Sequence, residues 1–189
     1  MSTLVVLAHP DLAASRINAA LAKTAEGVEG VTLHDLYAAY PDGRIDVAHE
    51  QRLLVEHDRI VLQFPFYWYS GTPLLKQWLD EVFAYGFAYG SKGTALHGKS
   101  LRVATSAGAP EAAYRPDGFK RYAVAELLRP FDATAHFSGM RYEEPLVVYG
   151  THELDDAGLA AHQDRYRELL GSEAQGDPEA QADPDLAVA

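Results

Sequence analysis

The chain has 189 residues, of which 48% are hydrophobic, and a formal net charge of -11. That length allows one domain with a full core, and the negative charge argues against a nucleic-acid partner, because phosphate contacts need a basic surface. The absence of cysteine excludes disulfides, thiolate metal sites and cysteine nucleophiles, and fits a reducing compartment.

The two ends of the sequence differ in character. Residues 1–8 lack the basic region of a signal peptide, and their apolar run is too short to span a bilayer, so we expect a cytoplasmic protein. Residues 171–189 contain five acidic residues and no lysine or arginine. We therefore predict one domain over residues 1–170 and a disordered acidic tail over 171–189, whose simplest role is that of an inert solubilising extension.

Five short apolar runs alternate with helical patterns along the domain, at residues 3–8, 31–37, 60–64, 101–106 and 145–149. Continuous runs of this kind are typical of parallel strands that are buried on both faces. They predict an α/β fold in three layers, α/β/α, with a doubly wound five-stranded parallel sheet. We expect the strand order 2-1-3-4-5, which is one of the two common orders of such sheets.

Capping residues indicate where three of the helices begin or end. The first helix is expected to begin near Ser15. A second begins where Thr72 can act as N-cap and Pro73 as the first helical residue. The last helix is expected to run from about residue 156 to Gly171 at its C′ position.

In the predicted strand order, the loops after the first, third and fourth strands converge on one crevice at the carboxyl edge of the sheet. In the first loop, Ser15 and Asn18 can hydrogen-bond at a helix N-terminus, and His9 and Arg16 can add positive charge. Such a group suits a phosphate. The same residues also fit a simple helix cap.

The second loop carries four consecutive aromatic residues, Phe66, Tyr67, Trp68 and Tyr69. Side chains of this size are costly to leave in water, so they should cover either a flat ligand or a partner subunit. The third loop, at residues 105–114, has small residues whose backbone N–H groups could approach a ring. Together the loops predict a site for a phosphate joined to a flat ring, as in flavin mononucleotide (FMN).

Motifs for other ligands are weak. Residues 93–100 fit G-x-x-x-x-G-K-[ST], but this segment leads into a strand, whereas a triphosphate loop follows a strand and opens a helix. Neither G-x-G-x-x-G nor G-x-S-x-G occurs, which weakens the dinucleotide-binding and hydrolase interpretations. The histidines are dispersed, so no metal site is predicted.

The order of motifs resembles one known family. A-H-P…S-x-x-N at residues 8–18, Y-P-D at 40–42 and Q-F-P-F-Y-W-Y-S-G-T-P-L-L-K-Q-W-L-D-E-V-F at 63–83 are similar to the flavodoxin-like NAD(P)H:quinone oxidoreductases. The likeness continues through residues 86–90, 94–99 and 127–131 and covers roughly residues 4–170. Within the family, the chain is most similar to short bacterial members, including the ancillary flavoproteins of glutathione-gated potassium efflux systems.

The resemblance implies a homodimer in which FMN, or alternatively FAD, takes hydride from NAD(P)H and passes two electrons to a quinone or another flat acceptor. Matched by motif, residues of the first loop would hold the phosphate end: His9, Ser15, Arg16, Ile17 and Asn18. Residues of the other two loops would contact the flavin ring: Pro65, Phe66, Tyr67, Trp68, Thr105, Ser106, Ala107 and Gly108.

Two single residues stand out within this resemblance. Tyr114 is similar to a family tyrosine near the carbonyl edge of the flavin, which makes it the candidate catalytic residue; an ordinary loop tyrosine is the alternative. Ala107 stands where the family often has glycine, so we expect its methyl group close to the ring.

Two other functions remain open at this stage. One is a regulatory subunit that contacts the soluble domain of a membrane transporter, with reductase activity secondary. The other is a one-electron carrier like flavodoxin, which is the weaker hypothesis because the aromatic run suits hydride transfer to bulky acceptors.

Overall fold

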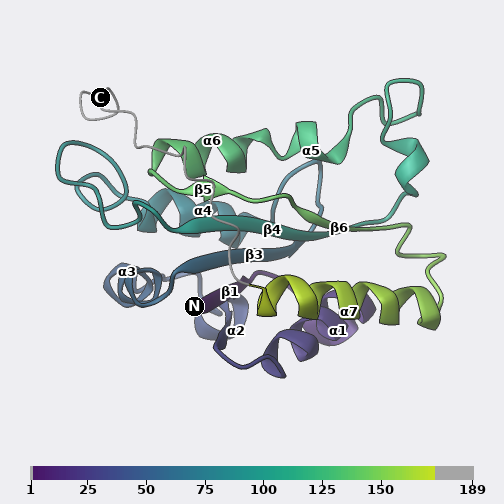
Figure 1. Cartoon of the computed structure of the whole chain (residues 1–189), viewed down its shortest axis with the longest axis horizontal. Helices are drawn as coiled ribbons and strands as arrows, with labels where there is room; N and C mark the ends of the chain where they lie inside the picture. The colour runs from purple at the N-terminus through teal and green to yellow at the C-terminus, as the bar shows by residue number, and fades with distance from the viewer. Residues whose placement is uncertain (1, 173–189) are drawn as a thin grey trace.

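The computed structural model describes residues 2–172, which form a six-stranded parallel sheet with helices on both faces (Figure 1). The strand order is β2-β1-β3-β4-β5, and β6 also pairs with β4. The strands are β1 (Thr3–Leu7), β2 (Val31–Asp35), β3 (Arg59–Pro65), β4 (Ser100–Ala107), β5 (Arg141–Tyr142) and β6 (Leu146–Tyr149). The predicted order 2-1-3-4-5 and the α/β class are confirmed.

Helices connect these strands in the alternating pattern that parallel pairing requires. The α-helices are α1 (Arg16–Glu26), α2 (Leu36–Ala39), α3 (Val47–Glu56), α4 (Pro73–Val82), α5 (Val124–Leu127), α6 (Arg129–Phe137) and α7 (Asp156–Gly171). Two short 3-10 turns, η1 (Leu12–Ala14) and η2 (Glu111–Ala113), follow β1 and β4. Within residues 2–172, no helix combines the length and the apolar character needed to cross a membrane.

Successive strand residues point to opposite faces of the sheet, and this alternation divides the core in two. Leu4 and Val6 pack with apolar side chains from α3, α4 and α6, whereas Val5 packs with side chains from α1 and α7. Figure 1 shows α1 and α7 on the opposite side of the sheet from α5 and α6. Both faces are covered, which explains why the strands read as continuous apolar runs.

The second strand is shorter than predicted. It ends at Asp35 instead of residue 37, because the Asp35 carboxylate accepts hydrogen bonds from the N–H groups of Tyr37 (3.0 Å) and Ala38 (3.2 Å) and thereby caps α2. The apolar residue Leu36, expected at the end of the strand, instead begins this helix and is buried.

The single fifth strand predicted at residues 145–149 is also wrong in detail, because two strands share the edge position. Leu101 pairs with Tyr142 in β5, and Ala104 pairs with Leu146 in β6. Three residue steps on β4 thus face four on the edge, so the edge segment carries one extra residue. Pro145 lies in this interruption, where its missing N–H is tolerated.

Two of the predicted helix caps differ in detail from the structure. Thr72 is the N-cap of α4 with Pro73 at N1, but its hydroxyl donates to the Ala8 carbonyl at 3.3 Å and ties α4 to the end of β1. Gly171 is the last residue of α7, and Ser172 takes the C-cap position. From residue 173 on, the predicted acidic tail lies outside the described residues.

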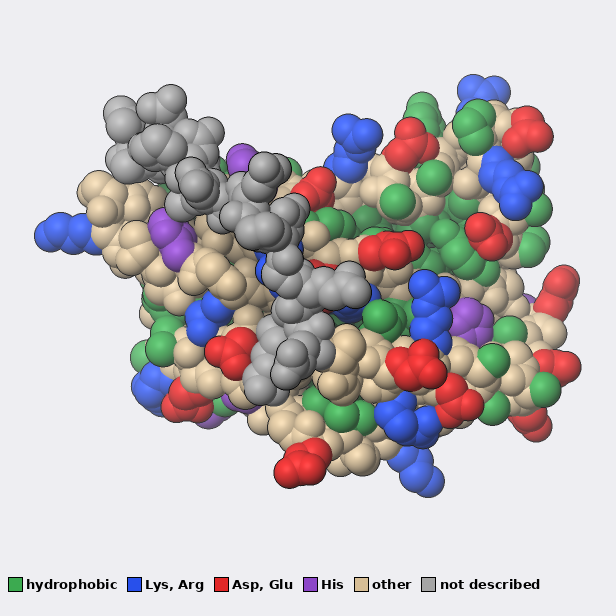
Figure 2. Space-filling view, in the orientation of Figure 1, with side chains coloured by type: hydrophobic (Ala, Val, Ile, Leu, Met, Phe, Trp, Pro, Cys, Tyr) green, Lys and Arg blue, Asp and Glu red, His purple; other side chains and the backbone are tan. Residues whose placement is uncertain are grey.

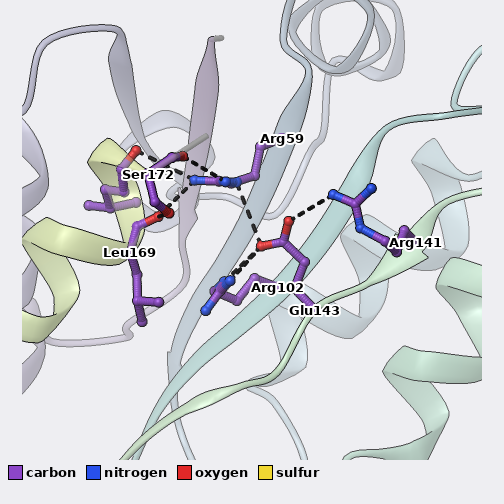
Figure 3. Close-up of polar contacts among 7 residues, drawn as sticks. Arg59, Arg102, Arg141, Glu143, Leu169 and Ser172 are labelled. Carbon is purple, nitrogen blue, oxygen red and sulfur yellow. Dashed lines mark hydrogen bonds and ion pairs between the residues drawn. The ribbon is translucent and has the colours of Figure 1, made fainter. Parts of the chain in front are cut away.

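A buried ionic cluster closes the amino edge of the sheet around Glu143 (Figure 3). Glu143 accepts two hydrogen bonds from Arg102, at 2.7 and 2.9 Å, and one from Arg141, at 3.2 Å. Arg59, which is almost fully buried, lies 3.6 Å from the same carboxylate and donates to the carbonyl groups of Leu169 and Ser172. The cluster therefore fixes the C-terminal end of α7 against β3.

Candidate functional site

A cavity of about 470 Å³ lies at the carboxyl edge of the sheet, where the loops after β1, β3, β4 and β6 meet. We call it the α1 cavity because the N-terminus of α1 forms one wall. Its lining residues are His9, Asp11, Ala14, Ser15, Arg16, Ile17, Asn18, Pro65, Phe66, Tyr67, Ser106, Gly108, Thr151 and His152. The structure thus brings together residues from all three loops that the sequence singled out.

The N-terminus of α1 presents polar groups to this cavity. Ser15 is the N-cap, and its hydroxyl accepts a hydrogen bond from the Asn18 N–H at 3.2 Å. The N–H groups of Arg16 and Ile17, in the first turn, have no partner within the helix. The buried Asn18 amide donates to the Ser106 hydroxyl at 2.9 Å, while its Oδ1 has no hydrogen-bond partner in residues 2–172. This end of α1 therefore offers free donors and one free acceptor.

Buried polar side chains hold α1 in this position over the sheet. Gln63 on β3 donates from Nε2 to the Asn18 carbonyl at 2.9 Å. The Tyr166 hydroxyl on α7 donates to Gln63 Oε1 at 3.1 Å. Because buried polar groups must be paired, this chain of contacts links α7, β3 and α1 and fixes the wall of the cavity.

The two basic residues expected to add positive charge are not free to do so. The Arg16 guanidinium pairs with Asp156 at 2.5 Å and donates to the Leu154 carbonyl at 2.7 Å. His9 is buried, and its Nδ1 accepts from the Asp11 N–H at 3.1 Å, which places the proton of the neutral ring on Nε2. Desolvation lowers the pKa of His9, so its ring is neutral at pH 7.

The aromatic run forms a tight turn after β3. The N–H of Tyr67 donates to the Ser70 carbonyl at 3.1 Å, and the N–H of Ser70 donates back at 3.0 Å. Between them Trp68 and Tyr69 have φ of 45° and 68°, a left-handed conformation that costs a non-glycine residue about 1–3 kcal/mol. The turn keeps Phe66 and Tyr67 in the α1 cavity but leaves Trp68 92% exposed, outside it.

In the third loop, too, some of the predicted residues line the cavity and others do not. Ser106 and Gly108 line the α1 cavity. Thr105 and Ala107 are buried; the Thr105 hydroxyl donates to the Phe64 carbonyl at 2.8 Å, and Ala107 packs in the core on the side of α4 and α6. The Ala107 methyl group, expected close to a bound ring, therefore does not line the cavity.

A second space adjoins the first. It measures about 210 Å³ and is lined by Phe66, Trp68, Tyr69, Tyr114 and Lys120; we call it the Lys120 hollow. Tyr114 is buried between Phe66 and Tyr149, with ring centroids 6.2 and 5.8 Å away. Burial raises its pKa, so the phenol is protonated at neutral pH. Within residues 2–172 no hydrogen bond to its hydroxyl occurs in the structure.

Thr151 and His152 belong to the cavity although the sequence analysis did not select them. They follow β6, and His152 Nε2 would lie only 3.1 Å from a Cβ placed on Gly108. Gly108 is thus the residue that leaves room for His152. The rule that selected the other loops, applied to the carboxyl end of the last strand, would have found both residues.

A third space of about 410 Å³ lies at the sheet edge between α5, β6 and α7. Figure 2 shows hydrophobic surface there with acidic and basic side chains around it. It contains none of the predicted cofactor-binding residues, and Glu111 and Glu144 line it. Because the residues selected from the three loops line the α1 cavity and not this space, we place the candidate cofactor site in the α1 cavity.

Comparison with known proteins agrees with this fold. Residues 1–170 match a family described as having a flavodoxin-like fold, and the chain belongs to that family.

Three similar proteins have a known role, bound cofactor or activity in their names. The ancillary protein KefG of a glutathione-regulated potassium-efflux system in Cronobacter sakazakii is 47% identical over 167 residues, which cover 88% of this chain and 91% of that protein. General stress protein 14 from Treponema denticola, whose structure was solved in complex with FMN, is 44% identical with a TM-score of 0.86. The match covers 90% of this chain and 98% of that protein. An NADPH-quinone reductase from P. pentosaceus is 35% identical with a TM-score of 0.83 and the same coverage.

Proposed function

We propose that this protein is an FMN-dependent NAD(P)H:quinone oxidoreductase. The observation that carries the proposal is the arrangement of the α1 cavity, in which a helix N-terminus and an aromatic turn line the same space at the carboxyl edge of the sheet. A helix N-terminus suits a phosphate and an aromatic wall suits a flat ring. The similar proteins named for FMN binding and for quinone reduction support the same assignment.

The residues present fit FMN by three features. The cavity volume of about 470 Å³ is in the range of ligand pockets, about 300–1,000 Å³. The first-turn N–H groups of α1 are donors that a phosphate can accept from. The unpaired Asn18 Oδ1 is a buried acceptor, and the ribityl chain of FMN carries hydroxyl donors. We therefore assign the phosphate to Ser15, Arg16 and Ile17, mainly through their backbone and short polar groups, and the neighbouring ribityl hydroxyls to Asn18.

When bound in the α1 cavity, FMN would supply the redox chemistry of a ping-pong cycle, namely hydride acceptance from NAD(P)H and two-electron delivery to a quinone. The chain itself supplies position and hydrogen bonds. Pro65, Phe66 and Tyr67 would flank the ring, and His9 would remain neutral beside it. Tyr114 keeps its proton and has a free hydroxyl in the Lys120 hollow, so we assign it the role of hydrogen-bond donor to the acceptor's oxygen.

The first test is the visible spectrum of the purified protein before and after anaerobic addition of NADPH. Flavin bands that bleach, together with FMN as the released cofactor by mass, are the expected result. A protein that neither carries nor binds FMN or FAD would contradict the proposal. A quinone is then added anaerobically to the reduced protein. Tyr114→Phe should retain FMN but be reoxidised by the quinone about tenfold or more slowly than wild type, whereas unchanged rates would remove Tyr114 from the mechanism.

A second candidate function is regulation of a potassium efflux transporter, with reductase activity secondary. The similarity to KefG over 88% of the chain is the observation that favours it. A gene for such a transporter next to this one would favour this role, as would binding of the purified protein to the transporter's soluble domain. Absence of both would leave the reductase as the sole proposal.

A further inference from the structure

The Lys120 hollow directly adjoins the proposed cofactor site. Phe66 lines both the hollow and the α1 cavity. A molecule that enters the hollow therefore lies next to the place assigned to the flavin ring. The side chains that line the hollow should then influence which molecules reach the flavin.

The walls of the hollow are aromatic and held in fixed orientations. The ring of Phe66 meets those of Tyr69 and Tyr114 edge to face, at centroid distances of 6.3 and 6.2 Å. The left-handed turn places Trp68 at the rim with its ring 92% exposed. This left-handed backbone is unfavourable for both turn residues. The fold therefore keeps aromatic side chains at this rim although the local backbone conformation costs free energy. These walls suit a flat ring.

Lys120 brings a positive charge into this aromatic setting. Its Nζ lies 5.5 Å from the centre of the Tyr69 ring and 5.4 Å from that of Phe119. The Lys120 N–H donates to the Ala113 carbonyl at 3.0 Å, which fixes this segment close to Tyr114. The side chain is half-buried, although lysine usually lies in water.

No ion pair among residues 2–172 includes Lys120. Arg16, the other lysine or arginine that lines either space, is paired with Asp156. Lys120 is therefore a cation without a carboxylate partner on a chain whose net charge is -11. An overall acidic protein repels anions, so a local cation at the entrance of the site decides whether an anionic molecule can bind there.

We infer that the Lys120 hollow binds flat aromatic molecules that carry an anionic group, and that Lys120 is the residue that selects them. The ring would lie against Phe66, Trp68 and Tyr69, and a sulfonate, carboxylate or phosphate would meet the Lys120 ammonium. The inference rests on the proposed function, because it names the kind of substrate that the reductase prefers. The anion can belong to the electron acceptor or to the nucleotide of NADPH, which also joins a ring to a phosphate.

The test compares the FMN-loaded wild type with Lys120→Gln, which removes the charge, and Lys120→Arg, which keeps it. Lys23→Gln, on the exposed side of α1 in its last turn, is the matched control. For each protein, kcat/KM is measured with 1,4-naphthoquinone and with its 2-sulfonate at low and high salt, and then with NADPH and NADH at a fixed neutral quinone. Binding of both quinones without NAD(P)H is followed by quenching of tryptophan fluorescence, since Trp68 lies at the rim and Trp78 is buried.

We expect Lys120→Gln to lower the preference for the sulfonated over the neutral quinone about tenfold at low salt, and the difference to shrink at high salt. Lys120→Arg and Lys23→Gln should keep the wild-type preference. If the preference for NADPH over NADH falls instead, the anion is the nucleotide phosphate and the inference still holds.

Unchanged preferences for both pairs in Lys120→Gln, together with unchanged binding of the sulfonate, would overturn the inference. A wild type that reduces neither quinone would contradict the proposed function instead. In that case the fluorescence titration still decides the inference, because a loss of sulfonate binding only in Lys120→Gln would support it.

Discussion

Tyr67 and Trp68 are adjacent in the sequence but lie in different surroundings. Tyr67 lines the α1 cavity, whereas Trp68, in a left-handed conformation, is exposed at the rim of the Lys120 hollow. The motif match grouped both residues as contacts of the flavin ring. It could not separate them, because the left-handed backbone at Trp68 forms between the two hydrogen bonds that join Tyr67 and Ser70. Side-chain identity therefore predicted the aromatic turn but not which of its rings enters the cavity.

This division gives a prediction for FMN binding. Tyr67→Ala should weaken FMN binding about tenfold, because aromatic stacking contributes roughly 1–3 kcal/mol per ring. Trp68→Ala should retain FMN within about twofold of wild type, since its ring lies outside the cavity. Titration of the apoprotein with FMN, followed by flavin fluorescence, measures both. Equal losses in the two variants would show that Trp68 turns inward when the cofactor binds.

Glu50 is a fully buried carboxylate that lines neither the α1 cavity nor the Lys120 hollow. Its oxygens accept hydrogen bonds from His34 (2.8 Å), Tyr40 (2.5 Å) and Trp78 (2.7 Å). Burial by itself would raise the pKa of Glu50, but these three hydrogen bonds hold it below its usual value. The network joins α3 to β2, to α4 and to the segment after α2.

Glu50 should therefore make stability depend on pH. Its folded pKa is lowered, so its contribution is fully present above the unfolded pKa of about 4.3 and is lost as the pH falls through the folded value. At pH 7, Glu50→Gln should lower the free energy of unfolding by about 1–3 kcal/mol, because its amide group would face a donor. Urea titrations should show this difference shrinking in acid. Glu26→Gln, at an exposed position, is the control and should track the wild type throughout.

At the scale of elements, the N-terminus of α1 combines a structural and a proposed binding role. Ser15→Ala removes the hydroxyl that caps the helix, and Asp46→Ala removes the equivalent cap of α3. Each change should lower the free energy of unfolding by about 1 kcal/mol. Only Ser15→Ala should also weaken FMN binding, by about tenfold or more, because Asp46 lines neither cavity. Equal FMN affinity in both variants would restrict Ser15 to capping.

The strands illustrate why boundaries were harder to predict than elements. The first, third and fourth strands were found at nearly the observed positions because both of their faces are buried and each contains a short apolar run. The second was overextended because the Asp35 side chain, hydrogen-bonded to its own backbone neighbours, turns the chain into α2. The fifth was merged because β5 contains only Arg141 and Tyr142, too few residues to form an apolar pattern.

At the level of the whole molecule, exposed aromatic side chains occur on the segments that form the Lys120 hollow, where Trp68 lines the space and the Phe119 ring lies 5.4 Å from Lys120 Nζ. Trp68, Phe119 and Tyr122 have exposed fractions of 92%, 75% and 57%. Apolar surface of this kind on a folded protein is typical of interaction sites. We propose that a second copy of the chain covers part of it, which agrees with the homodimer implied by the sequence resemblance.

The homodimer is tested by light scattering on a size-exclusion column. Wild type is expected at twice the mass of one chain, and Phe119→Glu should shift it towards the monomer by placing a charge in the interface. Tyr85→Glu is the matched control: Tyr85 is 69% exposed, and its loop lies at the opposite end of the molecule from the segment that carries Phe119 (Figure 1). A monomeric wild type, or equal effects of the two variants, would contradict this interface.

Local patterns of apolar and capping residues were enough to predict the class of fold and the loops that line the site, because buried parallel strands and helix caps have characteristic short sequences. The strand order followed from the usual order of such sheets. Which side chains face the cavity depends on tertiary contacts. Arg16 is paired with Asp156, 140 residues away, and Thr105 and Ala107 turn into the core. Lys120 is brought beside Tyr69 from another loop. These outcomes depend on contacts between distant segments, which no local pattern encodes.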